Sequence, residues 1–325
     1  MTPQAAEQER RATLRATLLV VLSACCFGSV SPLTVLALES GASLQGIQAW
    51  RYATTALLLI AYAAWKRVPT HVDPAQRWWK PRTLLIAGGG QAMVATFALL
   101  ALRWIPAATE AFLFYTFPAW VAVMTAVRGI ERLDRNRVVA LGLALGGIAF
   151  MVGAPSADSL HPTGVTLALV AAVVYSVYIP VLGALQRERP PLDVSRAIAV
   201  GGGIVFMTWA IVTGTLIENF TAKVFLVSAL QGVLSAGAFL GFLAGLAKLG
   251  AVRTSITSTV EPFWTALLGV VMLSQPVGVG TLIGGAAIMG AVLLLQRPVV
   301  SSAPLHSSSA REGDRPGRPP SRGAA

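Results

Sequence analysis

Long apolar runs alternate with short polar connections along almost the whole chain. Ten runs of about 20 residues each occupy about 16–37, 45–65, 83–102, 105–127, 136–154, 163–184, 196–217, 224–246, 251–273 and 277–296. As a helix, a run of this length crosses roughly 30 Å of hydrocarbon. The pattern therefore predicts an all-α membrane protein with ten transmembrane helices.

The composition agrees with a protein embedded in lipid. Of the 325 residues, 55% are hydrophobic and only 12% are charged, whereas charged residues make up about 25% of a soluble domain. The formal net charge of +11 does not indicate nucleic-acid binding, because the basic residues lie between the apolar runs rather than on one folded face. The expected partner is a lipid bilayer, and no nucleic acid.

The distribution of lysine and arginine predicts the orientation. Of the 25 basic residues, 21 lie in the N-terminal segment, in every second connection or in the tail, and the intervening connections hold only Arg103 and Lys223. Cytoplasmic loops carry such an excess. We therefore expect a multi-pass protein of the cytoplasmic (plasma) membrane with both termini in the cytoplasm, residues 1–15 as a cytoplasmic segment, and residues 298–325 as a disordered cytoplasmic tail.

The second half of the chain repeats the first. An offset of 144 residues aligns Pro118 with Pro262, Trp120 with Trp264, Ala122 with Ala266 and Gly146 with Gly290. The two copies cover residues 16–154 and 163–297, with five spans each. Because five is odd, the second copy enters the membrane from the opposite side. The sequence thus predicts two inverted five-helix repeats, an arrangement found in many secondary transporters.

A carboxylate and a proline stand side by side within the ninth run. Pro262 removes the backbone donor that the carbonyl of Ser258 would have met, so the helix must loosen there. Glu261 lies roughly 15 Å into the span, where an ionisable group indicates a functional site. It could hold a substrate ammonium or a proton. Alternatively, it is a fold-shaping acid, neutral or paired with Arg253 or with backbone donors. Pro118 predicts the same break in the fourth run.

Other candidates are polar or aromatic side chains within the spans. Glu110 and Glu261 are the only acidic residues in the runs, and Glu110 is either a coupling carboxylate or an interfacial one that reaches water. The candidates for lining a cavity are Gln91, Tyr115, Tyr175, Tyr178 and Ser258, with Trp120 and Trp264 as an aromatic wall. Packing between helices would explain each of them equally simply. Arg51 and Arg196 are expected to snorkel or to meet backbone carbonyls near an interface, or to bind an anion.

Several of these residues also carry a family resemblance. Arg51, the FPAWVAV of residues 117–123, Glu131, the LGLALGGIAFMVG of residues 141–153 and the Glu261–Pro262 pair stand in order on ten spans. In this, the chain resembles the drug/metabolite transporter superfamily, specifically its ten-helix EamA family. The resemblance implies a basket of helices around a central cavity that transports small organic metabolites, commonly amino acids or their relatives. The chain departs from the family pattern at Gln275, where a glutamate is usual.

The sequence also excludes some functions. No GxxxxGK motif for an ATP motor occurs, and the three histidines, His71, His161 and His306, all lie outside the runs. We therefore expect no enzyme, cofactor or metal site. The favoured function is a secondary active exporter that works by alternating access, with protons as a candidate coupling ion and a homodimer left open. The alternative is a non-transporting scaffold or sensor, which predicts a closed, dry midplane.

Overall fold

Helices make up nearly all of the described chain in the computed structural model. It describes residues 3–67, 77–101, 103–105, 107–130, 133–152, 161–273 and 279–295. The first half comprises α1 (Pro3–Gly28), α2 (Val30–Leu38), α3 (Leu44–Trp65), α4 (Pro81–Leu84), the π-helical turn η2 (Leu85–Gly89), α5 (Gly90–Ala101), α6 (Ala107–Phe114), α7 (Phe117–Val127) and α8 (Arg135–Val152). The second comprises α9 (Pro162–Leu185), α10 (Pro191–Val212), α11 (Ala222–Leu249), α12 (Ala251–Thr257), α13 (Val260–Leu273) and α14 (Val279–Leu295). Within the described ranges, each of the ten predicted spans contains helix.

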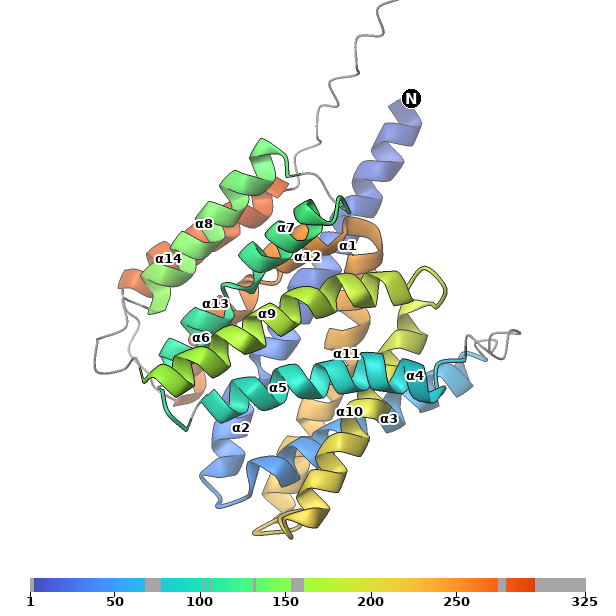
Figure 1. The fold of residues 1–325 in the computed structure, drawn as a ribbon, viewed down its shortest axis with the longest axis vertical. Coiled ribbons are helices and arrows are strands. Elements are labelled where there is room, and N and C mark those ends of the chain that lie inside the picture. Colours follow the sequence, from blue (N-terminus) through green and yellow to red (C-terminus); the bar gives the residue numbers. More distant parts are fainter. Residues whose placement is uncertain are drawn as a thin grey trace, which may run out of the picture.

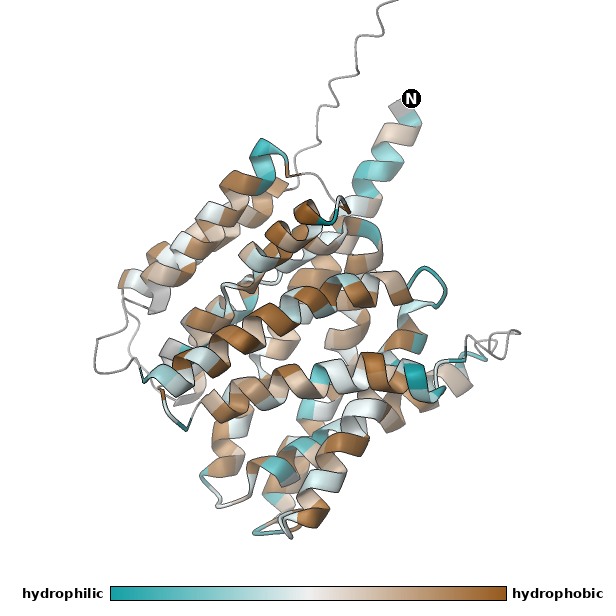
Figure 2. Ribbon diagram, viewed as in Figure 1, coloured by the Kyte–Doolittle hydropathy of each residue, from teal (hydrophilic) through white to brown (hydrophobic). Residues whose placement is uncertain are grey.

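Within the described ranges, five segments are long and apolar enough to cross a membrane unaided: Gln4–Leu38, Pro81–Ala101, Pro162–Leu185, Pro191–Val212 and Ala222–Leu249. The remaining spans are split, shorter or more polar. Large apolar side chains such as Leu57, 68% exposed, and Leu226, 70% exposed, face outward, as lipid contact requires. Hydrophilic residues gather at helix ends and on the N-terminal turns (Figure 2).

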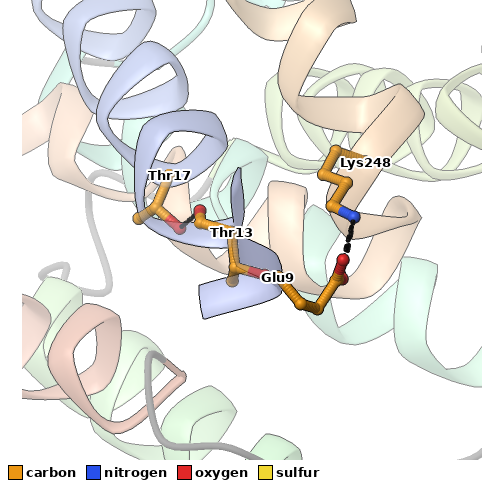
Figure 3. Close-up of polar contacts among 4 residues, drawn as sticks. All are labelled: Glu9, Thr13, Thr17 and Lys248. Carbon is orange, nitrogen blue, oxygen red and sulfur yellow. Dashed lines mark hydrogen bonds and ion pairs between the residues drawn. The ribbon is translucent and has the colours of Figure 1, made fainter. Parts of the chain in front are cut away.

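The connections lie at two opposite ends of the bundle (Figure 1). The N-terminal turns of α1 and the connection of residues 186–190 lie at one end, which we call the basic end. The connections of residues 39–43 and 213–221 lie at the other. An ion pair ties two segments of the basic end together, since Lys248 Nζ donates to both carboxylate oxygens of Glu9 at 2.7 and 2.8 Å (Figure 3). Such exposed pairs contribute only about 0–1 kcal/mol.

Helices from the two halves pack in a reciprocal pattern. The first span (α1) packs on the eighth (α11), and the sixth (α9) packs on the third (α5). The second and seventh spans (α3 and α10), the fourth and ninth (α7 and α12), and the fifth and tenth (α8 and α14) also meet. Exchanging the halves maps this set of contacts onto itself, as a two-fold axis requires. With five spans per half, the copies run in opposite directions, so the inverted repeat is confirmed.

Glycines bring the third and seventh spans together. A Cβ atom on Gly88 would collide with the backbone of Gly201, and one on Gly201 would meet the Leu84 carbonyl oxygen at 2.5 Å. Small residues let helix backbones approach closely in membranes. Gly88 and Gly201 therefore serve a close contact between these two helices.

The first span is broken into two helices, a feature that the sequence analysis did not predict. Pro32 has no N–H to offer the Gly28 carbonyl, and the helix divides at Ser29. Thr265 Oγ1 donates to that carbonyl at 2.9 Å, and Trp264 Nε1 donates to Ser29 Oγ at 2.9 Å. The break is thus stabilised by α13. In contrast, α9 continues through Pro180.

Candidate functional site

Two short turns interrupt the fourth and ninth spans. In the ninth, Ser258 and Thr259 separate α12 from α13, and the Ser258 carbonyl accepts instead from the Glu261 amide at 3.0 Å. In the fourth, Tyr115 and Thr116 separate α6 from α7. Pro118 and Pro262 both stand in the first turn of the helix after the break, because a proline needs no donor there.

A cavity of about 190 Å³ lies between the two halves, beside the turn in the ninth span. Its polar lining comes from both halves: Ser23, Ser31, Arg51, Gln91, Tyr175, Ser258 and Glu261. Its aromatic lining is Phe27, Phe114, Phe117, Phe239 and Phe242. The space between the two halves is therefore neither filled nor uniformly apolar.

Glu261 is the acidic residue of this lining. It is half-buried in the first turn of α13. The Tyr115 hydroxyl and the Arg51 guanidinium lie near enough to interact with its carboxylate. Arg253, which the sequence suggested as a partner, donates to the Leu295 carbonyl in α14. Glu261 thus faces a positive charge from the other half of the protein.

Arg51 lies deeper within the bundle than the snorkelling interpretation predicted. It lies seven residues after Leu44, roughly 10 Å into the span, and is buried within the bundle. Its Nε donates to Ser235 Oγ at 2.8 Å and its Nη1 to Gln48 Oε1 at 3.1 Å. Among the described residues, no carboxylate lies within ion-pair distance of it. It therefore neither snorkels nor pairs with carbonyls, and its charge faces the cavity.

The remaining polar candidates divide into two groups. Gln91, Tyr175 and Ser258 line the cavity, and the Tyr175 ring packs against Phe117 with centroids 4.8 Å apart. Tyr115 lies behind the lining, against Glu261. Tyr178 is turned away, because its hydroxyl donates to the Ala87 carbonyl in η2.

Glu110, Trp120 and Trp264 lie outside the lining. Glu110 is partly exposed in the first turn of α6, yet near enough to Glu261 for their charges to interact. Trp120 is 38% exposed on the surface of the bundle. Trp264 Nε1 donates a hydrogen bond to Ser29 Oγ at the break of the first span. The same repeat position therefore faces outward in one half and inward in the other.

Toward the basic end the lining of the cavity is apolar, and a buried ion pair lies beyond it. Leu182, Ile198 and Leu243 line this side. Two residues before Ile198, Arg196 forms a buried ion pair with Asp193, and its Cζ lies 4.9 Å from the Trp78 ring centroid. The expectation that Arg196 snorkels or meets backbone carbonyls is corrected, since it pairs with a carboxylate. The Trp78 ring packs against the core. Toward the other end the lining reaches the exposed Ser31.

No cluster of three or more His, Cys, Asp or Glu side chains occurs in the described ranges. Cys25 and Cys26 are free thiols. The chemistry available at the cavity is therefore that of one guanidinium, one carboxylate, hydroxyls, an amide and aromatic rings.

Two inverted five-helix halves with a polar cavity between them define a membrane protein of the transporter type. The chain belongs to the EamA-like transporter family, whose model matches residues 14–153 and 162–297. The resemblance drawn from the sequence is thereby confirmed. One solved crystal structure matches with a TM-score of 0.72 at 19% identity, covering 86% of this chain and 96% of that one, which shows the same fold. Comparison with curated protein sequences finds no match.

Proposed function

We propose that the protein is a secondary active transporter that exports small zwitterionic metabolites, such as amino acids or related compounds, across the cytoplasmic membrane by alternating access. The charge bias of the connections supports a cytoplasmic location for both termini. The observation that carries the proposal is the presence of Arg51 and Glu261, oppositely charged and from opposite halves, in the lining of one cavity.

The two charged groups match the two ends of a zwitterion. A guanidinium suits a carboxylate through charge-assisted hydrogen bonds, and two of the Arg51 donors are already held by Ser235 and Gln48, which fixes the group in place. A carboxylate suits an ammonium in the same way. The surrounding phenylalanine rings offer contact to an apolar substituent.

The volume of the cavity favours a small substrate. Sites for drug-sized ligands usually measure about 300–1,000 Å³, whereas this cavity measures about 190 Å³. A metabolite the size of an amino acid is consistent with that space. One chain supplies the whole lining, so the proposal does not require a second copy.

Movement of one half against the other would open the cavity to each side in turn. The Arg196–Asp193 pair beneath Trp78 joins the second half to the connection before α4, and we assign it to the closure toward the basic end. Glu261 is the proposed proton site, because substrate ammonium and proton would compete for the same carboxylate. No enzymatic step is part of the proposal.

The scaffold or sensor alternative predicted a dry, closed midplane. A cavity with seven polar side chains in its lining does not favour it.

Counterflow into proteoliposomes tests the proposed substrate class. A panel pairs each zwitterionic amino acid with the amine and the carboxylic acid that lack one of its charges. We expect the zwitterions to exchange at least tenfold faster than either analogue, because only they engage both Arg51 and Glu261. Intact cells that overproduce the protein should excrete the same compounds. Absence of exchange, or equal rates for the singly charged analogues, would contradict the proposal.

A further inference from the structure

A second hollow lies on the membrane-facing surface near the basic end. Its volume is about 850 Å³, and it is bounded by α1, α3, α11 and the start of α10. Two helix faces form its sides: Leu19, Leu22, Ser23 and Cys26 on α1, and Gly237, Leu240, Gly241 and Ala244 on α11. Each face extends over two helical turns, roughly 10 Å. We call this hollow the lipid-facing groove.

Two glycines on α11 have different roles in this groove. A Cβ atom on Gly241 would meet the Leu19 carbonyl oxygen at 2.7 Å, so that glycine serves the close packing of α1 on α11. A Cβ atom on Gly237 would find only Cys26 Sγ, at 3.9 Å. Gly237 is exposed, and its missing side chain leaves the floor of the groove open.

One cation stands at the end of this otherwise apolar groove. Lys66 lies in the lining together with Tyr62, one turn earlier on α3. Its Nζ lies 4.5 Å from the Trp65 ring centroid, and in the described part of the chain no carboxylate forms an ion pair with it. No acidic residue lines the groove. A lysine beside exposed tyrosine and tryptophan is typical of headgroup level, where it attracts anionic lipids.

We propose that the groove binds one anionic glycerophospholipid, with an acyl chain along the α1 and α11 faces and its phosphate on the Lys66 amine. This inference does not depend on the transport proposal. Because Ser23 lines both the groove and the central cavity, the bound chain would lie directly behind one cavity wall. The lipid would then support the packing of α1 on α11 at that wall.

Native mass spectrometry of the full chain, with phosphatidylglycerol and phosphatidylcholine of identical acyl chains, tests the lipid. We expect the wild type to retain one phosphatidylglycerol in preference to phosphatidylcholine. Lys66→Gln should weaken phosphatidylglycerol retention about fivefold and leave phosphatidylcholine retention unchanged. Equal retention of the two lipids by the wild type, or no effect of Lys66→Gln, would overturn the proposal.

Filling the groove tests the acyl chain separately. Gly237→Leu should weaken the retention of both lipids, because its side chain occupies the open floor. Two matched controls should behave as the wild type: Gly142→Leu, at an exposed glycine with nothing within 4 Å of a built Cβ atom, and Lys223→Gln, at an exposed lysine at the other end of α11. Unchanged retention in Gly237→Leu, or an equal loss in the controls, would count against this site.

Discussion

Replacing Glu261 with glutamine should lower substrate flux in proteoliposomes at least thirtyfold while the protein stays folded. The amide keeps the size of the side chain but can neither balance Arg51 nor release a proton. In the proposed complex the substrate ammonium would lose its carboxylate partner, and removing one member of such a buried pair costs about 2–5 kcal/mol, or about thirtyfold or more in affinity. The flux of the wild type should vary with pH, and the residual flux of the variant should not. Initial rates of counterflow over a range of pH measure both.

Two further variants make this result specific. Arg51→Gln should cause a loss of the same order, since it removes the opposite charge of the same site. Glu39→Gln, at an exposed carboxylate that ends α2, should transport as the wild type does. If Glu261→Gln retained full flux at every pH, Glu261 would have no coupling role and would be a fold-shaping residue. Size-exclusion profiles identify variants that fail by misfolding.

Gly88→Ala should destabilise the whole bundle. The added Cβ atom would collide with the backbone of Gly201, so the third and seventh spans would have to separate. Overpacking of this kind costs about 1–3 kcal/mol or more, and because the obstacle is backbone we expect the upper end. The melting temperature in detergent should fall by roughly 6 °C or more.

Gly146→Ala is the matched control for that experiment, because a Cβ atom at Gly146 meets nothing within 4 Å. Alanine is the better helix former by about 1 kcal/mol, so this variant should be as stable as the wild type or more stable. The two substitutions should therefore shift the melting temperature in opposite directions or leave only Gly88→Ala impaired. Equal shifts would mean that the contact between the third and seventh spans is not tight.

The parts of the fold that follow from local chemistry could be predicted from the sequence. Run length defines the spans, the odd number of spans per copy defines the inversion, and a proline at a fixed position explains the turns before Pro118 and Pro262. The break at Ser29 was not predictable in this way. Pro32 and Pro180 occupy matching positions, but only the Gly28 carbonyl receives a hydroxyl from α13, a contact between residues 237 positions apart.

The candidate site was only partly predictable for a similar reason. Glu261 was predictable because a carboxylate within an apolar span needs a partner, and this side chain does line the cavity. The position of Arg51 was not predictable, because its depth and its bond to Ser235 depend on how the second span packs against the eighth. Trp120 and Trp264 share a repeat position, yet helix rotation turns one outward and one against Ser29. Sequence symmetry does not determine which face of a helix meets the cavity.

The central claim is that the cavity beside Ser258 opens to each side of the membrane in turn. Its most direct test is a single cysteine at Ser258 in a chain with Cys25 and Cys26 replaced by alanine, labelled with a membrane-impermeant thiol reagent in vesicles of known orientation. A cysteine at the lipid-facing Leu57 serves as the unlabelled control. We predict that Ser258→Cys reacts from either side and that a zwitterionic substrate slows both reactions. Labelling from one side only, or from neither, whether or not substrate is present, would contradict the account.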